Sequence, residues 1–349
     1  MRSRHLGAIA VLVASQVGFA QDVPSDVTFS LKRAWLEQLL TGGPGGHSVG
    51  ARWSSQFRMG EHSNVHAVAA DCELHVAAKL AGNRTLASPA GIVVEPPNVC
   101  KKRVPQLPAG GQLGARWTKY FDDHVTGADC EVAGFPRIFS EHAQGGEANS
   151  SNPDHVVEIH PATSIACGGT TIDFLPLITV VPGMKRITDN SAVACLQDRK
   201  LHVRMRGGAA LARYEFLEEG AKGGNGRCGN FIVVDAHVSK DYIRALSNGN
   251  DHVALARVWI GESGPFPLKI YTYAGTQEDA AIAALLASAD ESESLEMPLH
   301  GLLTYDYFTI AQTLQEDDGN GGFRWKSTMK DYAEVSHPLS LVVFGKASP

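Results

Sequence analysis

Short runs of alternating apolar and polar residues dominate the chain from residue 49 onward, and glycine, proline, asparagine and serine clusters separate them. This pattern is typical of antiparallel strands joined by turns. Helical spacing is confined to residues 27–40 and 277–289, with one further helical turn expected at 241–247. We predict strands at 65–70, 73–80, 91–95, 123–125, 131–135, 155–165, 200–206, 213–217, 231–237, 253–260, 268–273, 305–314 and 340–344.

The pattern changes at Pro182-Gly183, which predicts two domains in a chain of 349 residues. We place a β domain at 49–178 and a second, antiparallel β-rich domain with one or two short helices at 179–349. Residues 21–48 are predicted to form a helix followed by a Gly-rich linker. Strands are rarely separated by helical patterns, so alternating βαβ units are not expected.

The first twenty residues have the layout of a secretory signal peptide. Arg2 and Arg4 precede the apolar run Leu6–Val13, and small residues end the segment at Ala20. An uncleaved N-terminal anchor is the alternative, although the apolar run is shorter than the roughly 20 residues of a membrane-spanning helix. We expect cleavage after Ala20, no membrane span afterwards, and export to the periplasm or the extracellular space.

Charge excludes one class of partner. The chain has 31 basic and 37 acidic residues, and loss of two arginines with the signal leaves 29 against 37, a net charge of −8. A dedicated nucleic-acid-binding domain is usually strongly basic, so we predict no such function.

Six cysteines lie in the exported part of the chain, and an even number in an oxidising compartment favours three disulfides. No Cys-x-x-Cys motif is present, so a zinc ribbon or a thioredoxin-type site is not indicated. Six cysteines allow 15 pairings, which the sequence alone does not distinguish. We predict the sequential pairing, which closes three loops of about 30 residues: Cys72–Cys100, Cys130–Cys167 and Cys195–Cys228.

Two Glu-x-His segments, Glu73-Leu74-His75 and Glu158-Ile159-His160, are the most distinctive chemical feature. Residues i and i+2 share one face of a strand, so each segment places a carboxylate beside an imidazole. If the strands are neighbours, Glu73, His75, Glu158 and His160 can bind a divalent metal or perform acid–base chemistry. The alternative is a solvated polar sheet face in which Glu–His pairs contribute only small cross-strand energies.

A resemblance extends over residues 65–167. It rests on Glu73-Leu74-His75-Val76, on Val94-Glu95-Pro96-Pro97-Asn98-Val99-Cys100, on Val125-Thr126-Gly127 and on Val157-Glu158-Ile159-His160-Pro161. This region resembles an OB-type barrel in exported bacterial proteins of uncharacterised function, an architecture shared with staphylococcal-type nucleases. The resemblance implies that the mainly β fold begins with an OB-like small barrel. The nuclease family's catalytic motif is absent, so no catalytic role is transferred.

Two short echoes raise the possibility of an internal duplication. Gly50-Ala51-Arg52-Trp53 recurs at Gly114-Ala115-Arg116-Trp117, and Ala70-Asp71-Cys72-Glu73 recurs at Ala128-Asp129-Cys130-Glu131. The two spacings differ, whereas a true repeat should keep one period. The sequence therefore leaves duplication and chance both open.

No complete catalytic signature is present, and the catalytic residues stay unknown. We expect an exported binding or structural module of the cell envelope with an unknown ligand or protein partner. The alternative is a metal-assisted hydrolase, nuclease-like or esterase-like, that uses the two Glu-x-His segments. No cofactor is predicted, while a divalent metal is possible at those four residues.

Overall fold

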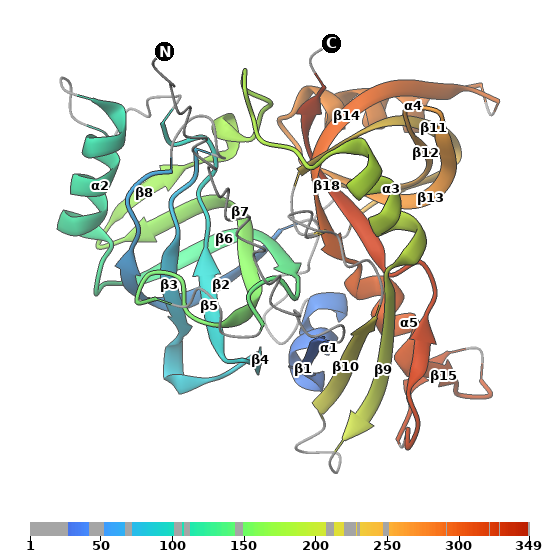
Figure 1. Cartoon of the computed structure of the whole chain (residues 1–349), viewed down its shortest axis with the longest axis horizontal. Helices are drawn as coiled ribbons and strands as arrows, with labels where there is room; N and C mark the ends of the chain where they lie inside the picture. Colours follow the sequence, from blue (N-terminus) through green and yellow to red (C-terminus); the bar gives the residue numbers. More distant parts are fainter. Residues whose placement is uncertain are drawn as a thin grey trace, which may run out of the picture.

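The computed structural model describes residues 27–41, 52–66, 72–100, 107, 112–143, 149–206, 213–219, 228, 231–246, 251–290, 292–320, 322–327 and 329–347. The expected signal peptide at 1–20, the Gly-rich linker after residue 41 and Asp71 lie outside these residues. The described part is mainly β, as the apolar alternation predicts (Figure 1). Within it, no helix combines the length and the apolar character needed to cross a membrane.

A first sheet, at the left of Figure 1, closes on itself. Its strand order is β5-β3-β2-β6-β7-β8, and β5 also pairs in parallel with β7, so five strands form a closed barrel. β6 lies beside β2, which gives β2, β3, β5 and β6 a Greek-key order. This arrangement is compatible with an OB-like barrel. The strands are β2 (Trp53–His62), β3 (Val76–Leu80), β5 (Gly91–Val94), β6 (Asp129–Ile138), β7 (His155–Cys167) and β8 (Thr170–Asp173).

Helix α2 (Leu113–His124) connects β5 to β6 and lies at the outer side of this barrel (Figure 1). Trp117 and Phe121 are fully buried, and the Trp117 ring lies 5.6 Å from that of Phe174 beyond β8. The prediction of a strand at 123–125 is wrong, because the apolar residues Trp117, Tyr120 and Phe121 form one helical face that covers the barrel. The second Gly-Ala-Arg-Trp segment is therefore helical, whereas Arg52-Trp53 leads into strand β2.

The C-terminal half contains a second closed barrel of order β11-β12-β13-β18-β14. Its strands are β11 (Phe231–Ala245), β12 (His252–Ile260), β13 (Ser263–Thr272), β14 (Ser294–Tyr305) and β18 (Leu339–Lys346). The described C-terminal half also contains three helices, α3 (Asp189–Asp198), α4 (Gln277–Ala287) and α5 (Tyr307–Leu314).

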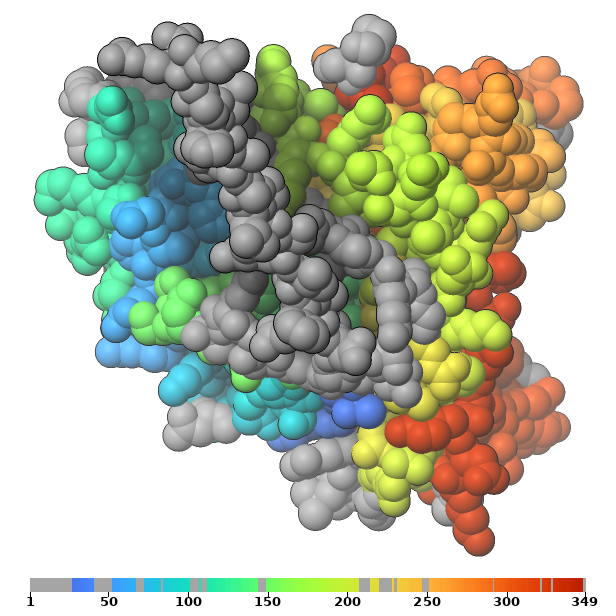
Figure 2. Space-filling view, in the orientation of Figure 1, coloured from blue at the N-terminus to red at the C-terminus, as the bar shows by residue number. Residues whose placement is uncertain are grey.

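A third sheet, of order β17-β9-β10-β1-β4, joins distant parts of the chain. β1 comes from the N-terminus, β4 from the segment between β3 and β5, and the other strands from the C-terminal half. Figure 2 shows the blue-to-green and yellow-to-red parts of the chain in contact. Its strands are β1 (Val27–Lys32), β4 (Ala87–Ser88), β9 (Lys200–Arg206), β10 (Arg213–Glu219) and β17 (Ala333–Val335). The remaining elements of the described chain are helix α1 (Arg33–Thr41), the separate hairpin of β15 (Gln315–Asp317) and β16 (Phe323–Trp325), and the 3-10 turns Ala81–Asn83 and Leu175–Leu177.

Three further local predictions are wrong for one shared reason: tertiary pairing overrides local propensity. The helix expected at 27–40 begins only at Arg33, because 27–32 pairs with β10. The helical turn expected at 241–247 is largely the end of strand β11, since Ile243–Ala245 pair with β12. The strand expected at 305–314 is helix α5, which the Asp306 side chain caps by accepting from the backbone N–H of Thr309 at 2.6 Å.

The three disulfides pair sequentially, as predicted: Cys72–Cys100, Cys130–Cys167 and Cys195–Cys228. Cys130 and Cys167 lie opposite each other on β6 and β7. The Cys72–Cys100 bridge holds the segment that enters β3 beside the segment that leaves β5. These bridges suggest that the protein folds in an oxidising environment.

Candidate functional site

The two Glu-x-His segments meet on the face of the first barrel that packs against the C-terminal half, where the His160 ring contacts Phe231 and Phe344. His160 Nε2 donates to Glu73 Oε1 at 2.8 Å, although the residues are 87 positions apart. Glu73, Glu158 and His160 are each at most 3% exposed, while His75 is half-buried. The interpretation of a solvated polar face is therefore wrong for these three residues. They form a buried polar cluster, and burial of charged groups requires compensating partners.

Glu95 joins this cluster, although the sequence analysis did not select it. Its Oε2 lies 2.6 Å from His160 Nδ1, and its Oε1 lies 3.5 Å from His75 Nε2. The parallel pairing of β5 with β7 brings Glu95 there, since Val94 lies opposite Ile159 and the Glu95 N–H donates to the Ile159 carbonyl oxygen at 3.0 Å. The sequence contained one signal for Glu95, which is that this carboxylate directly follows the apolar run ending at Val94.

A second group surrounds Glu158. Arg137 lies opposite Glu158 in the β6–β7 register and forms an ion pair with its Oε2 through Nη1. His155 Nε2 lies 3.1 Å from the other oxygen, Oε1, while His155 Nδ1–H donates to the Pro153 carbonyl oxygen at 2.6 Å. The His142 ring stacks on that of His155 with centroids 4.8 Å apart. Among these residues, only Glu158 was predicted from the sequence as a site residue.

Electrostatics favour a charged network. Burial alone raises the pKa of Glu95, but the nearby charges of His75 and His160 lower it to about 2. Burial also raises the pKa of Glu158, which the charge of Arg137 and the hydrogen bond from His155 hold well below its usual range. Burial lowers the pKa of His160, yet the charges of Glu73 and Glu95 raise it well above its usual value. His160 is therefore an imidazolium that lies between carboxylates.

The His160 ring is only partly satisfied by these neighbours. Its Nδ1 atom is close to Glu95 Oε2 but is not aligned for a hydrogen bond, so this buried nitrogen lacks a hydrogen-bond partner. Buried nitrogen atoms without partners are rare in folded proteins and require an explanation. The nitrogen also lies 3.5 Å from Glu158 Oε2. Three potential ligand atoms, His160 Nδ1 and the Oε2 atoms of Glu95 and Glu158, therefore lie close together.

The cluster lines a cavity of about 340 Å³. One side comes from the β2–β3 connection, another from the β6–β7 connection, and a third from the C-terminal half. Four carboxylates face two permanent cations, Arg137 and Lys185, so the lining has a net charge of −2 when its histidines are neutral. The lining residues are Ser63, His66, Glu73, His75, Glu95, Arg137, Glu141, His142, Asn149, Ser151, Asn152, Glu158, His160, Lys185, Phe231 and Leu302.

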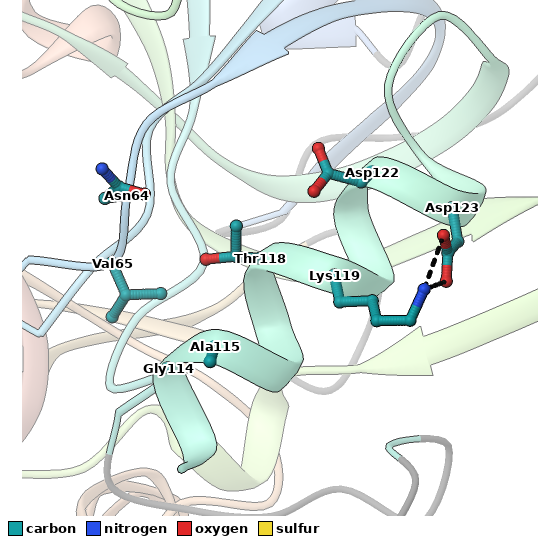
Figure 3. Close-up of a pocket in the computed structure, with 8 residues that line it drawn as sticks. All are labelled: Asn64, Val65, Gly114, Ala115, Thr118, Lys119, Asp122 and Asp123. Atoms are coloured by element: carbon teal, nitrogen blue, oxygen red, sulfur yellow. Dashed lines mark hydrogen bonds and ion pairs between the residues drawn. The ribbon is translucent and has the colours of Figure 1, made fainter. Parts of the chain in front are cut away.

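A second hollow, of about 540 Å³, offers less chemistry. Figure 3 shows Asn64 and Val65 on one side and residues of helix α2 on the other. Lys119 and Asp123 form an ion pair with each other at 2.8 Å, and Asp122 pairs with His62. Its charged groups thus satisfy one another on a helix surface, and we do not assign a function to it.

Two groups in or beside the 340 Å³ cavity have the composition of metal-ligand sets. Within Glu73, Glu95 and His160, and within His142, His155 and Glu158, the ligand atoms all lie within 4.8 Å of one another. Carboxylate oxygens and imidazole nitrogens are common ligands of Zn²⁺ and of Mn²⁺. His75 and His66, whose ring centroids are 4.4 Å apart, lie next to the first set.

No protein-family model matches the chain, and no curated protein matches it significantly. The interpretation of the cavity therefore depends on its own geometry and charge. The i, i+2 spacing predicted Glu73, His75, Glu158 and His160 as site residues, and the structure places all four around one cavity.

Proposed function

We propose that the protein is an exported, divalent-metal-dependent hydrolase whose active site is the 340 Å³ cavity. One observation carries the proposal: Glu73, Glu95 and His160 come from three separate segments, and their ligand atoms lie within 4.8 Å of one another in the wall of this cavity. Two carboxylates and one imidazole resemble the three-residue sets of catalytic metal sites, which keep one position open. A divalent ion held there would act as a Lewis acid and activate water for hydrolysis.

Charge supports this assignment. With His160 neutral, Glu73 and Glu95 contribute two negative charges, which one divalent ion would balance. Removing that ion leaves two buried carboxylates around a single imidazole, which is the arrangement that raises the pKa of His160. The proton on His160 therefore occupies the place of a cation, and metal binding would release it.

His75 is the best candidate for proton transfer. It is half-buried at the cavity wall, and its Nε2 lies 3.5 Å from Glu95 Oε1. Imidazole titrates near neutral pH and is the most frequent general acid or base in enzymes. In this scheme Glu95 and His66 orient the His75 ring.

The position of the cavity on the barrel suggests an extended substrate. OB-like barrels bind oligonucleotides and oligosaccharides through the connections between the first two and the last two strands. Here the β2–β3 and β6–β7 connections supply Ser63, His66, His142 and Asn149 to the lining. The expected signal peptide and the three disulfides support action in the periplasm or outside the cell.

A noncatalytic envelope-binding module is the second candidate, and one observation favours it. The charged groups compensate one another without any ion, since His160 lies between Glu73 and Glu95, and Arg137 pairs with Glu158. Such a rigid, charged wall can recognise a ligand without changing it.

Metal analysis and hydrolysis assays separate the two candidates. We would express the chain with oxidised disulfides, titrate Zn²⁺, Mn²⁺ and Ca²⁺ by calorimetry, and assay phosphodiester, carboxylic-ester and glycosidic substrates. Glu73→Gln and His160→Ala should abolish turnover and metal binding by the set Glu73, Glu95 and His160, while Glu262→Gln, at an exposed turn, should change neither. A wild-type protein that binds metal with unchanged affinity in Glu73→Gln and His160→Ala would refute the hydrolase. Turnover without metal binding would do the same.

A further inference from the structure

The Glu158 carboxylate separates two groups of potential ligands. Its Oε2 faces Arg137 and lies 3.5 Å from His160 Nδ1, whereas its Oε1 lies 3.1 Å from His155 Nε2. One oxygen thus points toward the set Glu73, Glu95 and His160, and the other points away from it. In dinuclear metal sites the two ions lie about 4 Å apart, and a carboxylate with one oxygen directed toward each ion can lie between them.

The His155 side has the features of an oriented ligand. Because Nδ1–H donates to the Pro153 carbonyl oxygen, a neutral His155 presents the lone pair of Nε2 toward Glu158. Metal-ligating histidines nearly always donate their other ring N–H in this way, which fixes the tautomer and the ring. His155 is 1% exposed, so its ring has little freedom to turn away.

His142 completes this set from the cavity side. It is half-buried, lines the cavity, and stacks on His155. Ligand atoms about 2.0–2.2 Å from Zn²⁺ lie roughly 3–4 Å apart from one another. The 3.1 Å separation of His155 Nε2 and Glu158 Oε1 already matches this spacing, and all three ligand atoms lie within 4.8 Å.

We propose that His142, His155 and Glu158 bind a second divalent ion, so that the cavity holds a dinuclear centre. This inference deepens the proposed function, because it adds an ion to the same cavity and names a substrate class. One divalent ion only neutralises the net charge of −2 on the lining, whereas two leave it at +2. A positive cavity with two ions fits an anionic phosphate ester, which dinuclear sites commonly hydrolyse.

Arg137 is a positioning residue in this arrangement. Its Nε donates to the Leu303 carbonyl oxygen at 3.1 Å, and its Nη1 pairs with Glu158 Oε2. The guanidinium therefore fixes the carboxylate with Oε1 turned toward His155. It acts through Glu158 and not by contact with an ion.

The test is a calorimetric titration of the full chain with Mn²⁺, combined with electron paramagnetic resonance. We expect two Mn²⁺ per wild-type chain and a spin-coupled signal from two nearby ions. His142→Ala should bind one Mn²⁺, lose the coupled signal and weaken the second site by at least about 100-fold, since even indirect partners of ligands contribute 10–100-fold. His142→Gln is a second variant, and His237→Ala on the far barrel is the matched control.

The possible outcomes distinguish this inference from the proposed function. One ion that is lost in Glu73→Gln but retained in His142→Ala overturns the second site and leaves the hydrolase proposal standing. One ion that is lost only in His142→Ala supports the second site and removes the metal position of the proposed function. A wild-type chain that binds no Mn²⁺ overturns both.

Discussion

His160 Nε2 lies 2.8 Å from Glu73 Oε1 between the first barrel and the C-terminal half, and both side chains are about 4% exposed. The pair links strand β7 to the segment that enters β3. In water such a pair contributes little, but inside the protein the loss of one partner leaves the other without compensation. This asymmetry makes the cluster sensitive to single substitutions.

His160→Ala should lower the free energy of unfolding of the metal-free protein by about 3–5 kcal/mol, because it leaves Glu73 and Glu95 buried without their shared cation. Glu73→Gln should lower it less, by about 1–3 kcal/mol, since the amide retains a hydrogen bond to His160 and Glu95 remains as the counter-ion. Urea unfolding measures both, with His237→Ala as the control. Equal, small effects in both variants would contradict the assigned charge state of His160.

The metal-free protein should be most stable between about pH 4.5 and 6.5. The pKa of Glu95 falls from 4.5 in the unfolded chain to about 2 in the folded protein, so its contribution is present above pH 4.5 and is lost as the pH falls toward 2. The pKa of His160 is raised above 6.5, so its contribution is present below pH 6.5 and is lost as the pH rises through the folded value.

Thermal unfolding between pH 2 and 9 in the presence of a chelator measures this profile. His160→Gln should flatten its alkaline side, because the amide does not titrate. Added Zn²⁺ should instead favour higher pH, since ligands must be deprotonated to bind metal. An alkaline side that persists unchanged in His160→Gln would assign the titration to another group.

Arg137 and Glu158 should be strongly coupled. Arg137→Met leaves Glu158 with only the histidines and should cost about 3–5 kcal/mol, whereas Arg137→Met combined with Glu158→Gln should recover part of that loss. A double-mutant cycle by urea unfolding gives the coupling energy. Strict additivity of the two substitutions would show that the ion pair does not contribute to stability.

Two disulfides provide a matched comparison of stability with site geometry. Cys72–Cys100 and Cys195–Cys228 close loops of similar sequence separation, 28 and 33 residues, so replacing either pair with serine should cost about 3 kcal/mol. Only the first bridge adjoins the site, because Cys72 precedes Glu73. Its removal should also weaken metal binding at least 10-fold, as measured by calorimetry. Equal affinities in the two variants would show that the bridge does not position Glu73.

Local pattern was sufficient for much of the chain. The alternation at 155–165 predicted most of strand β7, and the i, i+2 spacing placed Glu158 and His160 on one face. The mainly β class follows from the same periodicity. The sequential disulfide pairing, which was predicted because it closes three loops of similar length, is the observed one. These features depend on residues close together in the sequence, or on a count of cysteines.

Tertiary structure alone decided which distant residues became neighbours. Glu95 reaches His160 because β5 pairs in parallel with β7, and Arg137 reaches Glu158 through the β6–β7 register. The end of helix α2 and the whole of helix α5 form where strands were expected, since their apolar faces pack onto barrels that do not exist in an isolated segment. Periodicity along a chain states which side chains share a face. Barrel closure depends on the combined packing of strands far apart in sequence, and it determines which faces meet.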